Sequence, residues 1–304
     1  MDIPLDPLRW RIGLVGYGEV GRILAEDLRS RGLRVVAHDR KLGGPAESPL
    51  VEHAARYGVE LAGSHAELAA GADLIVSAVT ASQAVNVAEA CAPALRSGAW
   101  FLDFNSASPG AKIKAAGAIG GAGGRYVEGA VMTSIPPYRI RVPLLLGGAH
   151  AAALTPLLKT LGFDSKLASE KLGVASATKM CRSVMIKGLE AMVIESFTAA
   201  RAYGVEDQVL ASLAETFPGI DWERQGSYFF QRVIQHGRRR AEEMEEAAQT
   251  VREIGLEPFS AAGTAKRQAW VADLADAGLM GERDAPRENW RLDADRIIDT
   301  LNKP

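Results

Sequence analysis

Short apolar segments alternate with amphipathic stretches along the first half of the chain. Strands are predicted at 11–16, 34–38, 73–79, 99–104, 126–131 and 143–146. Helices are predicted near 20–31, 50–57, 82–95 and 108–118. Continuous apolar strands separated by helices are typical of a parallel sheet that is covered on both faces. The glycine-rich tract 117–124 is expected to be a loop, because glycine destabilises a helix by about 1 kcal/mol per residue.

The pattern changes after about residue 168. One helical pattern runs from Gly173 to Tyr203, and Gly204 is a favourable residue to end it. Only helical candidates follow, around 206–216, 223–254 and 259–277. We therefore predict an α/β fold, with a doubly wound Rossmann domain at 1–168 followed by an all-α domain at 169–304. A substrate is expected in the cleft between them.

A glycine-rich motif lies between the first predicted strand and the first predicted helix. It reads Gly16-Tyr17-Gly18-Glu19-Val20-Gly21. In a dinucleotide-binding turn the first glycine permits the tight turn, the second lets the backbone approach the pyrophosphate, and the third lets helix and strand pack closely. The helix N-terminus offers unpaired N–H groups to the phosphates. The motif therefore predicts a dinucleotide site made by all six residues.

The residues after the second predicted strand bear on which dinucleotide binds. Asp39 follows Gly21 at close to the spacing of about 20 residues expected for a carboxylate that binds the ribose hydroxyls. That carboxylate favours NAD, because it would repel a 2′-phosphate. Arg40 and Lys41 follow at once, and an arginine there can bind the phosphate. NAD is the predicted cofactor, and NADP stays open.

Three segments together resemble the β-hydroxyacid dehydrogenase superfamily, which includes 3-hydroxyisobutyrate and 6-phosphogluconate dehydrogenases. They are GLVGYGEVGRILAEDLRSRGLRVVAHD at 13–39, LDFNSASP at 102–109 and GVASATK at 173–179. The resemblance is clearest over 11–180. After 205 the chain resembles a subgroup of phosphogluconate dehydrogenase-like NAD(P)-dependent oxidoreductases.

The resemblance implies roles for individual residues. Asn105 and Ser106 would contact the nicotinamide ribose and the substrate, and Lys179 would be the catalytic lysine. We also place Val79 and Thr80, at the end of a predicted strand, in the cofactor site.

Two departures from the family pattern concern substrate recognition. The family's substrate loop reads Val-Ser-Gly-Gly, whereas this chain has Met132, Thr133 and Ser134 after the valine. The family often carries asparagine four residues after the lysine, where this chain has Ser183. We expect 132–134 and Ser183 to contact the substrate, so the reaction class is better supported than the substrate.

Oxidation of an alcohol by hydride transfer needs a group that accepts the hydroxyl proton. Lys179 is the candidate, because a lysine that is desolvated and close to another cation has a pKa lowered toward neutrality. Ser183 lies about 40° round an ideal helix from Lys179, and Lys187 about 80°. We expect Ser183 to hydrogen-bond the substrate or the amine, and Lys187 to contribute positive potential.

An arginine interrupts the apolar stripe of the helix predicted at 223–254. Arg240 is aligned with Val233, Met244 and Val251, and His236 lies one turn before it. An arginine on a buried stripe suits bidentate binding of an anion. We assign Arg240 to the substrate anion, with an ion pair between helices or subunits as the alternative.

Composition limits the partners. The chain of 304 residues has a formal net charge of −2, which argues against a nucleic-acid surface. No apolar run reaches the about 20 residues of a membrane span, and the first residues lack the apolar segment of a signal peptide. Cys91 and Cys181 have no metal-ligand spacing and are expected to be buried free thiols. We expect a soluble, cytoplasmic protein without a metal, and apolar helices in the second half suggest a homodimer.

The expected reaction is reversible hydride transfer between NAD(P) and a small, anionic hydroxy acid. An oxidative decarboxylase of the 6-phosphogluconate type would need several cations, of which only Arg240 and Lys187 are evident. An imine reductase is a third possibility, although such enzymes generally lack the lysine found at 179. A dinucleotide sensor without catalysis would bind the cofactor without turnover.

Overall fold

The computed structural model describes residues 3–286 and 289–301. The chain divides into two compact units, Met1–Met180 and Cys181–Pro304. The division falls within helix α7 (Val174–Tyr203), whereas the change of pattern predicted a boundary at residue 168. The first turns of α7 therefore belong to unit 1.

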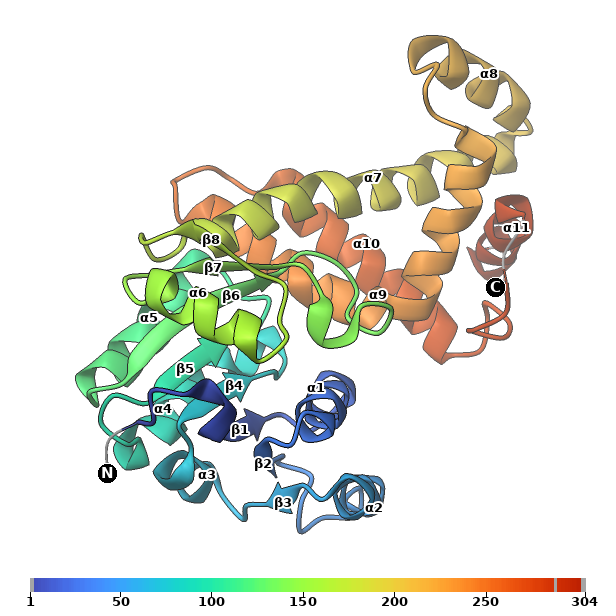
Figure 1. Ribbon diagram of the computed structural model, residues 1–304. Coiled ribbons are helices and arrows are strands. Elements are labelled where there is room, and N and C mark those ends of the chain that lie inside the picture. The colour runs from blue at the N-terminus through green and yellow to red at the C-terminus, as the bar shows by residue number, and fades with distance from the viewer. Residues whose placement is uncertain (1–2, 287–288, 302–304) are drawn as a thin grey trace. The chain divides into compact units, whose positions relative to one another are not determined.

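Unit 1 contains an eight-stranded sheet in the order β3-β2-β1-β4-β5-β6-β7-β8 (Figure 1). The strands are β1 (Arg11–Val15), β2 (Arg34–His38), β3 (Glu60–Leu61), β4 (Leu74–Ser77), β5 (Trp100–Asp103), β6 (Arg125–Val131), β7 (Leu144–Gly147) and β8 (Ser165–Ser169). All neighbouring strands are parallel except β6 and β7. The Rossmann prediction is confirmed, with one antiparallel pairing added.

Both faces of the sheet are buried, and each has its own core. Along β1, Ile12 and Leu14 join one core and Val15 joins the other, because successive side chains of a strand point to opposite faces. The first core includes residues of α1 (Glu19–Ser30), α2 (Ser48–Tyr57) and α6 (Ala151–Thr160). The second includes residues of α3 (His65–Gly71), α4 (Ala84–Cys91) and α5 (Pro109–Gly121).

The sequence analysis missed β3, β8, α3 and α6. β3, α3 and β8 are short, and β8 is exposed along most of its length. α6 has a buried apolar stripe, but it contains Pro156, which is unfavourable inside a helix. The expectation that 117–124 is a loop was wrong for its first half, because α5 continues to Gly121. Ile119 is fully buried in the second core, and burial of a side chain of that size contributes about 1.5–3 kcal/mol, which offsets most of the cost of about 3 kcal/mol from Gly117, Gly120 and Gly121.

Unit 2 is helical. It contains the rest of α7, followed by α8 (Glu206–Thr216), α9 (Trp222–Arg252), α10 (Phe259–Asp276) and α11 (Trp290–Leu301). Figure 1 shows α9 and α10 packed side by side. The helices predicted up to residue 277 are confirmed, and α11 was missed. None of the described helices has a segment long and apolar enough to cross a membrane.

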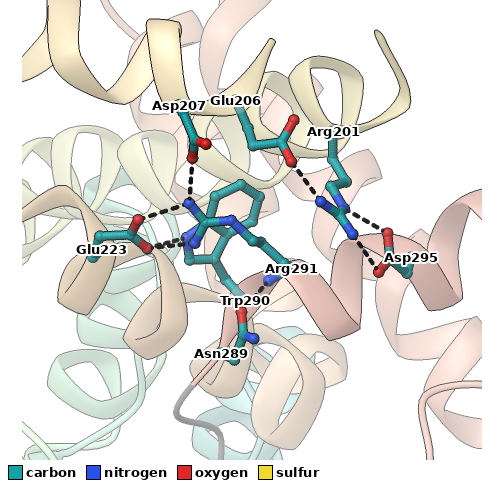
Figure 2. A network of polar contacts seen from close by, with 8 residues as sticks. All are labelled: Arg201, Glu206, Asp207, Glu223, Asn289, Trp290, Arg291 and Asp295. Atoms are coloured by element: carbon teal, nitrogen blue, oxygen red, sulfur yellow. Dashed lines mark hydrogen bonds and ion pairs between the residues drawn. The ribbon is translucent and has the colours of Figure 1, made fainter. Parts of the chain in front are cut away.

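A polar network attaches α11 to the neighbouring helices. Figure 2 shows its members, Arg201, Glu206, Asp207, Glu223, Asn289, Trp290, Arg291 and Asp295. Arg201 bridges Glu206 and Asp295, and Arg291 bridges Glu223 and Asp207. Partly exposed ion pairs contribute about 0–1 kcal/mol each. The fully buried Trp290, which packs on Phe197 and Phe230, is therefore the stronger attachment.

The two cysteines are free. Cys91 is buried in the second core of unit 1, as expected, and burial raises its pKa to about 12. Cys181 is exposed, so the expectation of burial was wrong there.

The imidazole of His65, at the start of α3, packs against that of His38 with 4.5 Å between ring centroids. Burial lowers the pKa of His65, and positive charge on His38 lowers it further. Below the ordinary histidine value of about 6.5 the unfolded chain then takes up a proton before the folded chain does. The free energy of unfolding should therefore fall as pH drops from that value toward the lowered pKa.

The variant His65→Gln should show a shallower fall over the same pH range, since it lacks the proton uptake. Urea denaturation at a series of pH values measures this. An unchanged slope in the variant would assign the acid sensitivity to other groups.

Candidate functional site

The parallel strands of unit 1 bring the predicted cofactor residues, and the predicted substrate residues that precede α7, to one edge of the sheet. β2, β1, β4, β5 and β6 are neighbours and all parallel, so their carboxyl ends share that edge. The segments that follow them are 16–21, 39–40, 79–80, 105–106 and 132–134. The strand order reverses between β1 and β4, which is where open α/β sheets bind ligands.

Two glycines of the glycine-rich motif are required by the fold itself. Gly16 has φ +89°, and a Cβ there would lie 2.3 Å from the carbonyl oxygen of Ala78. A Cβ on Gly21 would lie 2.1 Å from the carbonyl oxygen of Gly16. The absence of a side chain lets Gly16 lie against the segment that follows β4, and lets Gly21 in α1 lie against Gly16, which is the close packing that the motif predicts.

Gly18 differs, because nothing in the described part of the chain requires a glycine there. Its φ is −75°, and among the described residues an added Cβ would meet no atom within 4 Å other than those of its neighbours in the chain. Gly18 is the N-cap of α1 and has no side chain with which to cap the first turn. The amides of Glu19 and Val20 lie in this turn, with the Glu19 side chain exposed. The uncapped N-terminus of α1, next to a glycine that the fold does not require, is suited to the approach of a dinucleotide pyrophosphate.

Asp39 connects the end of β2 to the glycine-rich motif. Its Oδ2 accepts a hydrogen bond from the backbone N–H of Tyr17 at 2.8 Å, and its Oδ1 accepts one from Lys41 at 3.0 Å. Both oxygens keep lone pairs, so the carboxylate can still accept hydrogen bonds from a ribose. Arg40 is exposed beside it.

Tyr17 was placed in the cofactor site, and the structure limits that role to its backbone. The side chain is fully buried, and its hydroxyl bonds to Nδ1 of His53 at 2.7 Å. Burial raises the pKa of Tyr17, so the phenol stays neutral.

Asn105 joins the segments that follow β4 and β5. Its Oδ1 accepts a hydrogen bond from the backbone N–H of Val79 at 2.7 Å, and its Nδ2 donates to Oγ of Ser77 at 3.0 Å. Val79 and Thr80 are thereby fixed in position. The amide is buried and oriented toward these protein partners, and its contact with a nicotinamide ribose stays a prediction.

Lys179 and Ser106 come together at this edge. Nζ of Lys179, in the second turn of α7, donates a hydrogen bond to Oγ of Ser106 at 2.5 Å. Both residues are partly exposed. The motifs at 102–109 and 173–179, which lie far apart in the sequence, therefore supply an amine and a hydroxyl to one place. Such a pair can exchange a proton with a bound alcohol.

The loop after β6 lies at the same edge. Met132 is half-buried, whereas Thr133 and Ser134 are exposed. Arg139 anchors the far part of the loop to α1 through Glu26 at 2.7 Å and Asp27 at 2.8 Å. The anchor holds Arg139 at φ 54°, which is uncommon for a residue other than glycine.

Sequence reasoning missed two buried carboxylates on adjacent strands. Asp103 of β5 pairs with Lys112 at 2.8 Å and accepts a hydrogen bond from the hydroxyl of Tyr126 at 2.7 Å. Burial raises the pKa of Tyr126 well above its ordinary value, and the charge of Asp103 raises it further, so the phenol remains a donor. Glu128 of β6 is in register with Asp103. The available signal was an acidic residue in each of two otherwise apolar strands.

The remaining predicted substrate residues, Ser183, Lys187 and Arg240, belong to a buried polar cluster in unit 2. Nζ of Lys187 lies 2.7 Å from Oε2 of Glu243 and donates to Oγ of Ser183 at 3.2 Å. Burial lowers the pKa of Lys187, and Glu243 offsets part of that effect.

Arg240 forms a bidentate ion pair with Glu190 of α7, with Nε donating to Oε2 at 3.0 Å and Nη2 to Oε1. Both side chains are buried. This is the ion pair between helices that the sequence left as the alternative. Binding of a substrate anion by Arg240 stays a prediction, and it would compete with Glu190.

Both halves of the chain match known protein families. Residues 11–162 match the family model of the NAD binding domain of 6-phosphogluconate dehydrogenase, and residues 200–271 match a domain of unknown function (DUF1932). A conserved hypothetical protein from Sinorhizobium meliloti 1021 is 36% identical, with a TM-score of 0.76 over 95% of this chain and 97% of that one.

Two further solved structures are similar. The conserved protein MTH1747, described as similar in structure to 3-hydroxyacid dehydrogenases, is 28% identical, with a TM-score of 0.68 over 88% of this chain and 98% of that one. A 3-hydroxyisobutyrate dehydrogenase from Mycobacterium tuberculosis, solved with L-serine, is 17% identical, with a TM-score of 0.66 over 97% of this chain and all of that one (100%). At that identity the likeness shows the fold alone.

Replacement of Arg240 by alanine should lower the free energy of unfolding by about 3–5 kcal/mol, because it leaves the buried charge of Glu190 without its cationic partner. The double variant Arg240→Met/Glu190→Met removes both charges and should recover much of that loss. Urea denaturation of the three proteins measures the difference. A single variant as stable as the wild type would show that the pair is dispensable and would leave Arg240 available for a ligand.

Proposed function

Because the chain belongs to the β-hydroxyacid dehydrogenase superfamily, we propose that it is an NAD(P)-dependent dehydrogenase of a small hydroxy acid, with Lys179 as the general acid and base. The hydrogen bond of 2.5 Å between Lys179 and Ser106 carries the proposal. This bond holds the amine of Lys179 beside the hydroxyl of Ser106, at the edge of the sheet where the glycine-rich motif lies.

The residues at this edge suit a dinucleotide. The first turn of α1 would receive the pyrophosphate over Gly18, and Asp39 would accept hydrogen bonds from the adenosine ribose. Asn105 would act at the nicotinamide end of the cofactor indirectly, because its hydrogen bond to Val79 holds Val79 and Thr80 in position. NAD(P), when bound, supplies the hydride acceptor for oxidation and the hydride donor for reduction.

Asp39 supports a preference for NAD over NADP. Its two hydrogen bonds to backbone N–H groups fix the carboxylate next to the glycine-rich motif, where it would repel a 2′-phosphate. Arg40 is exposed next to Asp39 in the sequence and is the residue that could bind that phosphate instead. NADH should therefore bind more tightly than NADPH.

Lys179 would move the proton. In the oxidation direction its neutral amine takes the proton of the substrate hydroxyl as the C–H hydride leaves, and in reduction the ammonium returns it. Ser106 would orient the amine. The exposed hydroxyls of Thr133 and Ser134 are suited to hydrogen-bond the substrate's carboxylate.

The charge balance of unit 2 favours a simple hydroxy acid over a sugar phosphate. The two cations that a 6-phosphogluconate-type decarboxylase would use, Lys187 and Arg240, each pair with a carboxylate of the same cluster. Carbon dioxide release during turnover would instead support the decarboxylase. Cofactor binding without turnover of any hydroxy acid would support a sensor.

Replacement of Lys179 by alanine should lower kcat by about 10²–10⁴-fold, the usual contribution of a positioned acid or base. The dissociation constant for NADH should change little, because the lysine is not placed in the pyrophosphate site. The assay follows NADH formation from NAD⁺ with 3-hydroxyisobutyrate as the first hydroxy acid, and Lys166→Ala, on the exposed part of β8, is the control. A Lys179→Ala variant with wild-type kcat would refute the assignment.

Gly18→Ala should leave the free energy of unfolding unchanged within about 0.5 kcal/mol, because the methyl group meets no protein atom. It should weaken NADH binding by about tenfold or more, since the methyl group would occupy the space of the pyrophosphate. Gly21→Ala is the matched comparison and should destabilise the fold, because its Cβ would lie 2.1 Å from a carbonyl oxygen. Fluorescence titration with NADH and NADPH, with urea denaturation, separates the effects. Unaltered NADH binding by Gly18→Ala would contradict the assigned pyrophosphate position.

A further inference from the structure

Glu128 is a fully buried carboxylate on β6, which lies between β5 and β7 in the sheet. It is in register with Gly147 on β7, and a Cβ on Gly147 would lie 2.2 Å from Oε1 of Glu128. The glycine therefore leaves the space through which the side chain of Glu128 passes. A buried carboxylate is costly unless its charge is compensated, so its partners show what it does.

The partners of Glu128 are backbone N–H groups at the start of α7. Oε1 accepts hydrogen bonds from Gly173 at 2.7 Å and Ala175 at 3.1 Å, and Oε2 accepts one from Ser176 at 3.2 Å. These donors lack partners within the helix. The negative charge also lies at the positive end of a helix of 30 residues, where it is stabilised.

A distant carboxylate is needed here because the local cap has no side chain. The first helical hydrogen bond of α7 runs from Ala177 to the carbonyl of Gly173, which places Gly173 at the N-cap. Gly173 has φ +92°, a conformation that side chains disfavour. The usual capping serine or aspartate is thus excluded, and Glu128 takes its place.

The cap fixes the turn that precedes Lys179. Lys179 lies one turn after Ala175 on the same rigid helix, and its amine reaches Ser106 in the segment that follows β5. Glu128 on β6 therefore ties the helix to the neighbouring strand of the same sheet. We propose that Glu128 is a positioning residue for Lys179: it holds the first turn of α7 so that the amine meets Ser106. This inference rests on the proposed role of Lys179.

The first test needs no substrate. In Glu128→Gln, an amide N–H group faces the backbone donors in place of one oxygen, so the cap weakens. Amide hydrogen exchange of the peptide 173–180 should become about tenfold faster. Acetylation of Lys179 by acetic anhydride, read by mass spectrometry against the exposed Lys166, should rise by about threefold or more as the turn opens.

Asp73→Asn is the matched control. Asp73 is also a buried carboxylate that accepts a backbone N–H, from Arg11 at 2.8 Å, but it precedes β4 at the opposite edge of the sheet. The Asp73→Asn variant should have a lower free energy of unfolding, with no change in the amide hydrogen exchange of 173–180 or in the acetylation of Lys179. Gly147→Ala is a second test variant, because its methyl group displaces the carboxylate and keeps its charge. Wild-type exchange and acetylation in both Glu128→Gln and Gly147→Ala would overturn the inference.

A double-mutant cycle with NAD⁺ and the same hydroxy acid tests the coupling to turnover. Glu128→Gln should lower kcat by about tenfold or more, with NADH affinity unchanged. On the Lys179→Ala background the same substitution should have no further effect, whereas two independent effects would multiply. If Lys179→Ala is inactive and Glu128→Gln has a wild-type kcat, the inference is overturned and the proposed function stands. A fully active Lys179→Ala refutes the proposed function, and exchange and acetylation still decide whether Glu128 holds the turn.

Discussion

The arrangement of the site depends on the hydrogen bonds between the carboxylate of Glu128, on β6, and the first turn of α7. A carboxylate inside a sheet needs compensation, and three N–H groups at a helix end need acceptors. The carboxylate accepts the hydrogen bonds of the N–H groups, and these groups compensate its charge. The pairing also explains Gly147, which leaves room for the side chain of Glu128, and it supplies the cap that Gly173, at φ +92° and without a side chain, does not provide. One buried charge thus accounts for features on three separate elements.

The periodicity of the sequence predicted most of the fold, because it reports burial. Strands such as β2 and β5 are apolar on both faces and were placed to within a residue or two. α8 was predicted with its observed limits, 206–216. Elements with little burial of their own, such as β3 and β8, give no such signal. α5 was shortened for the opposite reason, since Ile119 contributes tertiary packing that local glycine content does not reveal.

The candidate site was predicted less completely, because a motif names residues and does not name their partners. Lys179 and Ser106 came from two separate motifs, and only the fold brings them within 2.5 Å. Arg240 was correctly recognised as unusual on an apolar stripe, and the alternative explanation, a carboxylate on another helix, could not be chosen from α9 alone. Glu190 lies 50 residues away in the sequence. Glu128 was missed because nothing in its neighbourhood indicates that a helix end will reach it.

The three motif glycines separate what the fold requires from what a ligand requires. Gly16 and Gly21 face carbonyl oxygens at distances that no Cβ could occupy, so a protein with this fold would keep them even if it bound nothing. Gly18 has an ordinary backbone conformation and open space around it. Its lack of a side chain has no value for folding, and an uncapped helix is a small disadvantage. A glycine that the fold does not need, at the helix end where a dinucleotide would approach, is therefore stronger support for cofactor binding than the two that shape the turn.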